Sequence, residues 1–245
     1  MKKSILLSLI LIITTAFQSV ANDFNRGMYE LNRGEFHEAI NQFQPLVDDN
    51  YAPAQYQMAK IYLYGYGTSK NNNKALELMK KAAGQNYPDA QFALSVIYSE
   101  GKLVDKDLNK AFELMEKAAI KELPSAQFNL GVMYAQGEGT KQDYYQAARW
   151  YKKSADQNFA LAQFNLALMY FEGKGVEKSN YLSYVWNSVA AKGGYKNAEK
   201  SRDIDERNLS VEEIKSAREE ANLIYNKLVR KQDVEAKIAA EKLTF

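Results

Sequence analysis

The sequence has 245 residues, with 32 basic and 30 acidic side chains, one histidine and no cysteine. Without cysteine the chain can form no disulfide, thiolate nucleophile or thiolate zinc site. The formal net charge of +2 argues against a nucleic-acid binder that works through a broad basic face, and against a polybasic membrane anchor.

Residues 1–21 have the pattern of a secretory signal peptide. Two lysines precede an apolar stretch at 5–13, and Ser19 and Ala21 place small residues where signal peptidase requires them. The apolar stretch is shorter than the about 20 residues of a membrane span; an uncleaved N-terminal anchor is the alternative. We therefore expect a mature chain that starts near Asn22, is periplasmic or secreted, and has no stable membrane insertion.

A 36-residue repeat organises most of the remaining chain. An Ala-Gln-aromatic motif begins each repeat, at Ala54, Ala90, Ala126 and Ala162. Apolar residues follow four positions later, at Met58, Leu94, Leu130 and Leu166, and tyrosines eight positions later, at Tyr62, Tyr98, Tyr134 and Tyr170. These spacings define one face of a helix. Each helix is expected to end at a left-handed glycine: Gly65, Gly101, Gly137 and Gly173.

A second helix is predicted in every repeat. Its N-cap residues are Asn71, Asp107, Asp143 and Ser179. Small residues follow at Ala75, Ala111, Ala147 and Ser183, and larger ones at Leu78, Leu114, Trp150 and Trp186. The repeats close at Asn86, Glu122, Asn158 and Gly194, and all of these except Glu122 are residue types that tolerate a left-handed turn. Helix pairs of this kind stack on copies of themselves in an α-solenoid.

The pattern resembles the Sel1-like repeat family, whose members are relatives of the tetratricopeptide repeats. Repeat three matches its consensus best, with Ala126, Leu130, Gly131, Tyr134, Gly137, Gly139, Ala147, Ala148, Trp150, Tyr151, Lys153 and Ala155. Repeat two departs from it, because Leu103 stands where the other repeats have Gly67, Gly139 and Gly175, so we expect another loop path there. The resemblance implies an all-α fold: a right-handed α-solenoid of 36-residue helix-turn-helix repeats with N- and C-terminal capping helices.

The repeats define the expected domain boundaries. A tetratricopeptide-like capping hairpin is predicted at 22–51, followed by repeats at 52–87, 88–123, 124–159 and 160–195. Degenerate C-terminal cap helices are expected at 196–230, the second of them opened by a capping box from Ser210 to Glu213. Residues 231–245 are expected to be a charged, frayed tail.

No catalytic, cofactor or metal site is predicted. His37 has no motif around it, and we interpret it as a solvent-facing helix residue. The paired glycines of the loops lack the preceding strand of a nucleotide-binding loop and are interpreted as helix stops. Four aromatic residues could form a sugar-stacking platform, but their register favours the core: Trp150, Tyr151, Tyr184 and Trp186.

The candidate binding site is the side of each first helix opposite its buried face. This column reads Lys60, Val96, Val132 and Leu168, with the neighbours Tyr64, Glu100, Gln136 and Glu172. One interpretation is a concave groove with an apolar floor that binds an extended peptide or a partner helix. In the other, tight curvature buries the aliphatic residues between adjacent first helices.

The resemblance implies an exported, non-enzymatic adaptor or scaffold of a Gram-negative bacterial envelope, with a protein partner in the groove. A cell-wall or β-lactam binding protein is an alternative, since cysteine-rich Sel1-like relatives have such roles; this chain lacks their cysteines and any Ser-Lys motif of the β-lactamase type. A structural subunit docked through the charged C-terminal helix is another. The sequence leaves the partner's identity and the oligomeric state open.

Overall fold

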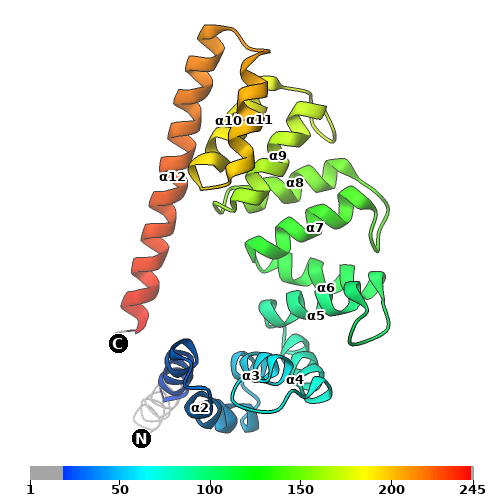
Figure 1. Ribbon diagram of the computed structural model, residues 1–245, viewed down its shortest axis with the longest axis vertical. Coiled ribbons are helices and arrows are strands. Elements are labelled where there is room, and N and C mark those ends of the chain that lie inside the picture. The colour runs from blue at the N-terminus through cyan, green and yellow to red at the C-terminus, as the bar shows by residue number, and fades with distance from the viewer. Residues whose placement is uncertain (1–18, 244–245) are drawn as a thin grey trace, which may run out of the picture. The chain divides into compact units, whose positions relative to one another are not determined.

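The computed structural model describes residues 19–243, with side chains through residue 238, and these residues form helices and loops without a strand (Figure 1). Residues 19–33 are helical. The helices that follow are α2 (Phe36–Asp48), α3 (Ala52–Tyr64), α4 (Asn72–Gly84), α5 (Pro88–Glu100), α6 (Leu108–Ile120), α7 (Pro124–Gln136), α8 (Tyr144–Ala155), α9 (Ala160–Glu172), α10 (Asn180–Lys192), α11 (Lys196–Glu206) and α12 (Val211–Leu243). The chain divides between Asp105 and Lys106 into two compact units, so α2–α5 lie in unit 1 and α6–α12 in unit 2.

The predicted helix ends are confirmed in every repeat. The four C-cap glycines adopt the left-handed conformation, with φ of 75°, 69°, 73° and 71° for Gly65, Gly101, Gly137 and Gly173. Each predicted N-cap is extended, and its side-chain oxygen accepts a backbone hydrogen bond from the third residue of the second helix, as Asp143 does from Gln146. Polar groups at the helix ends are thus satisfied locally.

Alanines form the contact surfaces between helices. The first alanine of each motif is fully buried, at Ala54, Ala90, Ala126 and Ala162. Of the four aromatic residues assigned to the core, Tyr151, Tyr184 and Trp186 are buried as predicted. Trp150 is half-buried, and the ammonium group of Lys153 lies 4.2 Å from the centre of its ring. None of the four forms an exposed platform.

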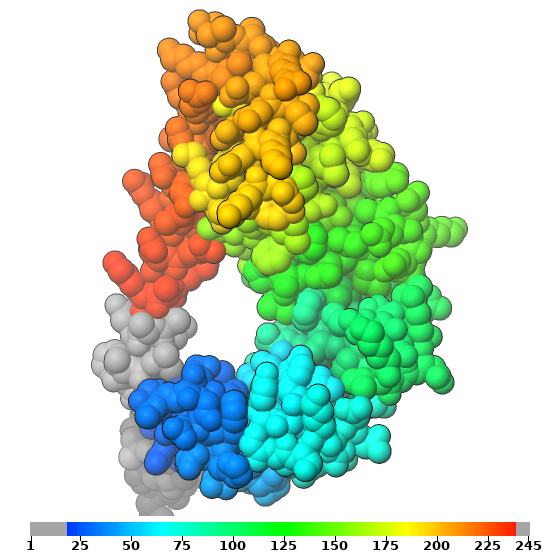
Figure 2. Space-filling model, viewed as in Figure 1, coloured from blue at the N-terminus to red at the C-terminus, as the bar shows by residue number. Residues whose placement is uncertain are grey.

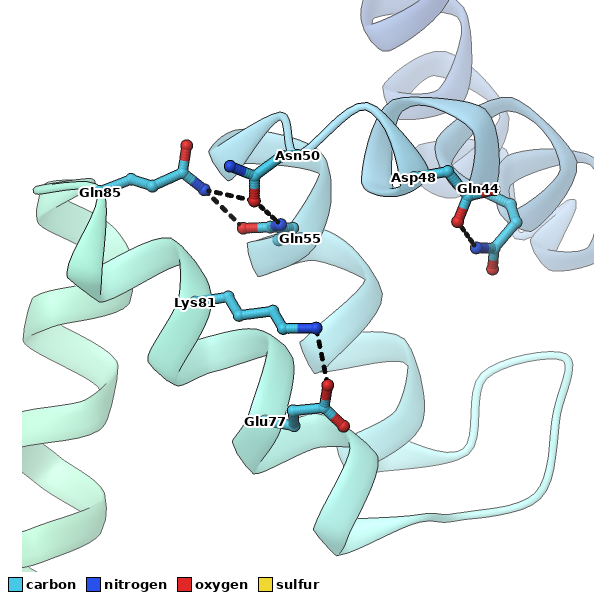
Figure 3. Close-up of polar contacts among 7 residues, drawn as sticks. All are labelled: Gln44, Asp48, Asn50, Gln55, Glu77, Lys81 and Gln85. Atoms are coloured by element: carbon cyan, nitrogen blue, oxygen red, sulfur yellow. Dashed lines mark hydrogen bonds and ion pairs between the residues drawn. The ribbon is translucent and has the colours of Figure 1, made fainter.

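The turns between repeats are held by side-chain amides. In unit 1 the buried Gln55 donates from Nε2 to Asn50 Oδ1 at 2.8 Å, and Gln85 donates to Gln55 Oε1 at 2.8 Å (Figure 3). Asn50 is itself left-handed, with φ of 60°. Glu122 also adopts φ of 64°, although its residue type does not favour this conformation. Its carbonyl accepts a hydrogen bond from Gln157 Nε2 at 2.9 Å, which helps to hold this backbone.

The second loop glycine is required by contact with the preceding repeat. A Cβ atom on Gly139 would overlap the carbonyl oxygen of Leu108, the first residue of α6, and one on Gly175 would overlap the carbonyl of Tyr144 in the same way. Both glycines have positive φ, whereas Leu103 does not. The different loop path expected in repeat two is therefore confirmed.

The C-terminal part of unit 2 ends the array with polar helices. The predicted capping box is confirmed, since Ser210 N donates to Glu213 Oε2 at 2.8 Å and Glu213 N to Ser210 Oγ at 3.3 Å. Helix α12 then packs against α10 (Figure 1) and continues without a break through Leu243. Residues 1–18 of the predicted signal peptide lie outside the described residues. Within the described part of the chain, no helix is long and apolar enough to cross a membrane.

Candidate functional site

In unit 1 the predicted outward column is partly exposed and aromatic. Lys60 is half-buried, with its ammonium group 5.4 Å from the ring centre of Tyr56, and Tyr64 is exposed with its ring centre 5.4 Å from that of Tyr66. On α5, Val96 is half-buried and Glu100 is exposed, with an ion pair of 3.2 Å to Lys102. Each helix therefore presents one half-buried and one exposed residue of the predicted site.

In unit 2 the same column becomes more apolar and more exposed towards the C-terminus. Val132 is half-buried and packs against the buried apolar core of unit 2, Leu168 is 39 % exposed, and Ile204, in the same register on α11, is 47 % exposed. Gln136 and Glu172 are exposed, the latter with an ion pair of 2.8 Å to Lys174. Full burial of the column by curvature does not occur at Leu168 or Ile204.

A pocket of about 170 Å³ opens between α9, α10 and α11. Its apolar lining comes from one face of α9 and from α11: Phe164, Leu168, Phe171 and Ile204. Its polar lining is Ser183, Asn187, Ser201 and Asp205. Helix α10 packs against both α9 and α11, so the pocket belongs to unit 2 alone. In Figure 2 the side chains of α11, in gold, form part of the face towards the viewer.

Three of the polar residues form a hydrogen-bonded cluster. Asp205 is 1 % exposed, and its Oδ2 accepts hydrogen bonds from Ser183 Oγ at 2.9 Å and from Asn187 Nδ2 at 2.8 Å. Burial raises the pKa of the Asp205 carboxyl above its ordinary value, and the two hydrogen bonds oppose that rise. No described lysine or arginine forms an ion pair with Asp205.

The predicted site included Leu168 but missed the residues beside it. Asp205 occupies the column that holds Ile61, Ile97, Met133 and Met169 in the repeats, and Asn187 the column of Met79, Met115 and Tyr151. Ser183 occupies the column that holds Ala75, Ala111 and Ala147. Comparing these columns would have shown three polar residues at apolar positions near the end of the array, and that signal marks the pocket.

The described residues contain no group of three or more potential ligands for a metal ion. His37 is exposed on α2, as its interpretation as a solvent-facing residue predicts.

The chain belongs to the Sel1 repeat family. The sequence profile of the Sel1 repeat matches residues 52–87, 88–122, 124–159 and 160–195, which is more than half of the chain. With the helix pairs described above, this establishes an all-α solenoid of Sel1 repeats. Proteins of this family are generally protein-interaction scaffolds and typically non-enzymatic.

Solved structures of similar proteins have the same fold. A protective antigen of uropathogenic Escherichia coli strains with an SLR fold is 30 % identical, with a TM-score of 0.74 over 91 % of this chain and 48 % of that one. The chain thus spans about half the length of the E. coli protein. A Sel1 repeat protein of Oxalobacter formigenes is 26 % identical, with a TM-score of 0.67 over 71 % of this chain and 72 % of that one. A putative Sel1 repeat protein of Klebsiella pneumoniae, 18 % identical with a TM-score of 0.51 over 79 % of this chain and 96 % of that one, shares the fold. The comparison with curated proteins found no match.

Proposed function

We propose that this chain is a non-enzymatic scaffold that binds a partner protein on the outward face of its first helices. The observation that carries the proposal is the exposure of Leu168 and Ile204, 39 % and 47 %, on that face of α9 and α11. Exposed aliphatic side chains that line a pocket, as Leu168 and Ile204 do, are typical of sites for an extended peptide or an amphipathic helix. The general role of Sel1 repeats in protein interaction supports the same conclusion.

We further propose that the scaffold works in the bacterial envelope, in the periplasm or after secretion. Support comes from the basic start, short apolar stretch and small residues at Ser19 and Ala21 in the first 21 residues. The similar E. coli protein is described as a protective antigen. The absence of cysteine fits either location, because the repeats need no disulfide to pack.

The test is capture of the partner from crosslinked cells, followed by mass spectrometry, with substitutions on the binding face. Leu168→Lys puts a charge on that face and should release the partner while the chain keeps its helicity. The matched control is Ile120→Lys, because Ile120 is 62 % exposed on the second helix of repeat two. If both variants retain the partner, the proposed surface is wrong.

A structural role for the end of α12 is a second candidate. Val234 and Ile238 lie four residues apart, on one side of the helix, and are 55 % and 47 % exposed. Such a stripe could dock on a larger assembly. Truncation after Lys231 tests this, because loss of assembly with intact folding supports docking through α12, and unchanged assembly excludes it.

A further inference from the structure

We propose that the pocket between α9, α10 and α11 binds the cationic side chain of an arginine or lysine of the partner. The inference rests on the proposed function and deepens it, since it names the chemistry that anchors the partner. The occupant is a group with several N–H donors, a positive charge and an apolar stem.

Two oxygen atoms of the polar residues that line the pocket accept no hydrogen bond from the described residues. Asp205 Oδ2 accepts two hydrogen bonds, whereas its Oδ1 accepts none from the described residues. Asn187 is 3 % exposed, and its Oδ1 is buried without a hydrogen-bond partner. Buried polar atoms without a partner are uncommon in folded proteins, and of the six among the described residues only Asn187 Oδ1 belongs to a residue that lines this pocket. A guanidinium group carries N–H donors in a planar fork that can reach two acceptors at once.

The negative charge of the Asp205 carboxylate has no ion-pair partner among the described residues. A buried carboxylate is costly unless a cation and hydrogen bonds accompany it. Here the chain supplies two hydrogen bonds, from Ser183 and Asn187, but no described cation within ion-pair distance of Asp205. A basic side chain of the partner supplies the missing charge. A neutral or acidic side chain would leave the carboxylate as it is or repel it.

The walls of the pocket suit the stem of such a side chain. Phe164, Leu168, Phe171 and Ile204 line the pocket with apolar surface, against which the methylene groups of an arginine or lysine can pack. The Phe171 ring already has the ammonium group of Lys178 5.9 Å from its centre, so a cation is accommodated beside it. The volume of about 170 Å³ is comparable with the roughly 150 Å³ cavity that holds a benzene ring in another protein. A guanidinium with its adjoining methylenes is of that size.

The register of the repeats argues against a purely structural cluster. In repeat three the positions equivalent to Ser183 and Asn187 are Ala147 and Tyr151, and both are buried apolar residues of the core. Packing of these helix pairs therefore needs no polar residue at those positions. At the end of the array all three positions are polar, and Ser183 and Asn187 both donate hydrogen bonds to the Asp205 carboxylate.

The experiment is a titration of the isotope-labelled chain, residues 22–245, with N-acetyl-L-arginine amide, followed by NMR of the Asn187 side-chain amide and the Leu168 and Ile204 methyl groups. We expect saturable shifts at these groups. N-acetyl-citrulline amide has the same shape without the charge and should bind at least about tenfold more weakly. Lysine amide should bind in place of the arginine probe.

Two variants on one helix make the test specific. Asp205→Asn removes the buried charge and should weaken binding of the arginine probe by at least about tenfold. Asp203→Asn removes an exposed carboxylate that pairs with Arg202 at 3.2 Å, and should leave binding unchanged. A third variant, Ser183→Ala/Asn187→Met/Asp205→Met, restores residue types found elsewhere in these columns and should fold without binding the probe.

The proposal is overturned if the citrulline probe binds as well as the arginine probe, if no residue of the pocket responds, or if Asp205→Asn binds normally. Failure here is distinct from failure of the proposed function. A partner that Leu168→Lys releases and Asp205→Asn retains would refute the cationic anchor and leave the binding face in place.

Discussion

Gly131 on α7 lies against the ring of Tyr151 on α8, so closely that a Cβ atom on Gly131 would lie 2.7 Å from Cδ1 and Cε1 of Tyr151. In repeat one the same two positions hold Ala59 and Met79. In repeat one the larger residue of the first helix, Ala59, is thus paired with a flexible methionine in the second helix, where repeat three has a rigid tyrosine ring. The close approach of the two backbones in repeat three depends on the glycine.

Gly131→Ala should therefore destabilise repeat three. Overpacking costs about 1–3 kcal/mol, which exceeds the roughly 1 kcal/mol that alanine gains over glycine within a helix. The measurement is amide hydrogen exchange of α7 and α8, which reports local opening in a repeat protein. In a Tyr151→Met background the same substitution should be neutral or stabilising, and an equal loss in both backgrounds would contradict the steric account.

Alanine substitutions at the two glycines of the repeat-three loop distinguish backbone strain at positive φ from steric overlap with the preceding repeat. Both have positive φ, 73° for Gly137 and 68° for Gly139, so alanine is strained at either position by about 1–2 kcal/mol. At Gly139 the new Cβ would also overlap the Leu108 carbonyl, whereas at Gly137 the nearest atom is 3.2 Å away. We expect Gly139→Ala to lower the urea midpoint more than Gly137→Ala. Equal effects would show that the loop does not depend on its contact with α6.

The N-cap of α8 offers a test of local helix stability. Asp143 accepts a hydrogen bond from the backbone of Gln146 at 2.9 Å, and its removal in Asp143→Ala should cost about 1 kcal/mol. Asp143→Ser is the matched control, because Ser179 caps α10 in the same way. Hydrogen exchange at the start of α8 should accelerate in the alanine variant and not in the serine variant.

The buried carboxylate predicts a pH dependence of stability. Burial raises the pKa of folded Asp205 above its ordinary value of 3.8, so between these two values the folded chain holds a proton that the unfolded chain has released. The stability that this group contributes is therefore present at low pH and is lost as the pH rises through the raised pKa. Asparagine does not titrate and retains an acceptor for Ser183 and Asn187.

The stability of Asp205→Asn relative to the native chain should accordingly increase as the pH rises from 3.8 and level off above the raised pKa of Asp205. Urea unfolding at a series of pH values measures this difference, with Asp203→Asn treated identically as the control. A difference that decreases with pH would mean that the folded protein favours the ionised carboxyl.

Periodicity predicts most of this fold because each structural requirement recurs. Helix caps, loop glycines and buried alanines are determined by contacts within a repeat or with its neighbour, and the same contact is made every 36 residues. Glu122 shows the limit of residue preference, since its left-handed backbone is held partly by Gln157, which lies 35 residues away along the chain. That hydrogen bond is visible only in three dimensions.

The candidate site was predicted less completely for a related reason. The outward column follows from helical geometry, which places Leu168 on an exposed face. The pocket beside it depends on three departures from the repeat, at Ser183, Asn187 and Asp205, that meet across α10 and α11. In the sequence each departure looks like an isolated polar substitution. The structure shows that Ser183 and Asn187 both hydrogen-bond to the Asp205 carboxylate.

The central claim is that a partner binds the outward face of the first helices, and site-specific photocrosslinking in cells tests it most directly. Benzoylphenylalanine is placed at Leu168 and Ile204 on that face, and at Ile120 and Tyr145, which are 62 % and 60 % exposed on second helices. The account predicts one discrete adduct from the first two positions and none from the other two. Adducts from Ile120 or Tyr145, with none from Leu168 and Ile204, would contradict it.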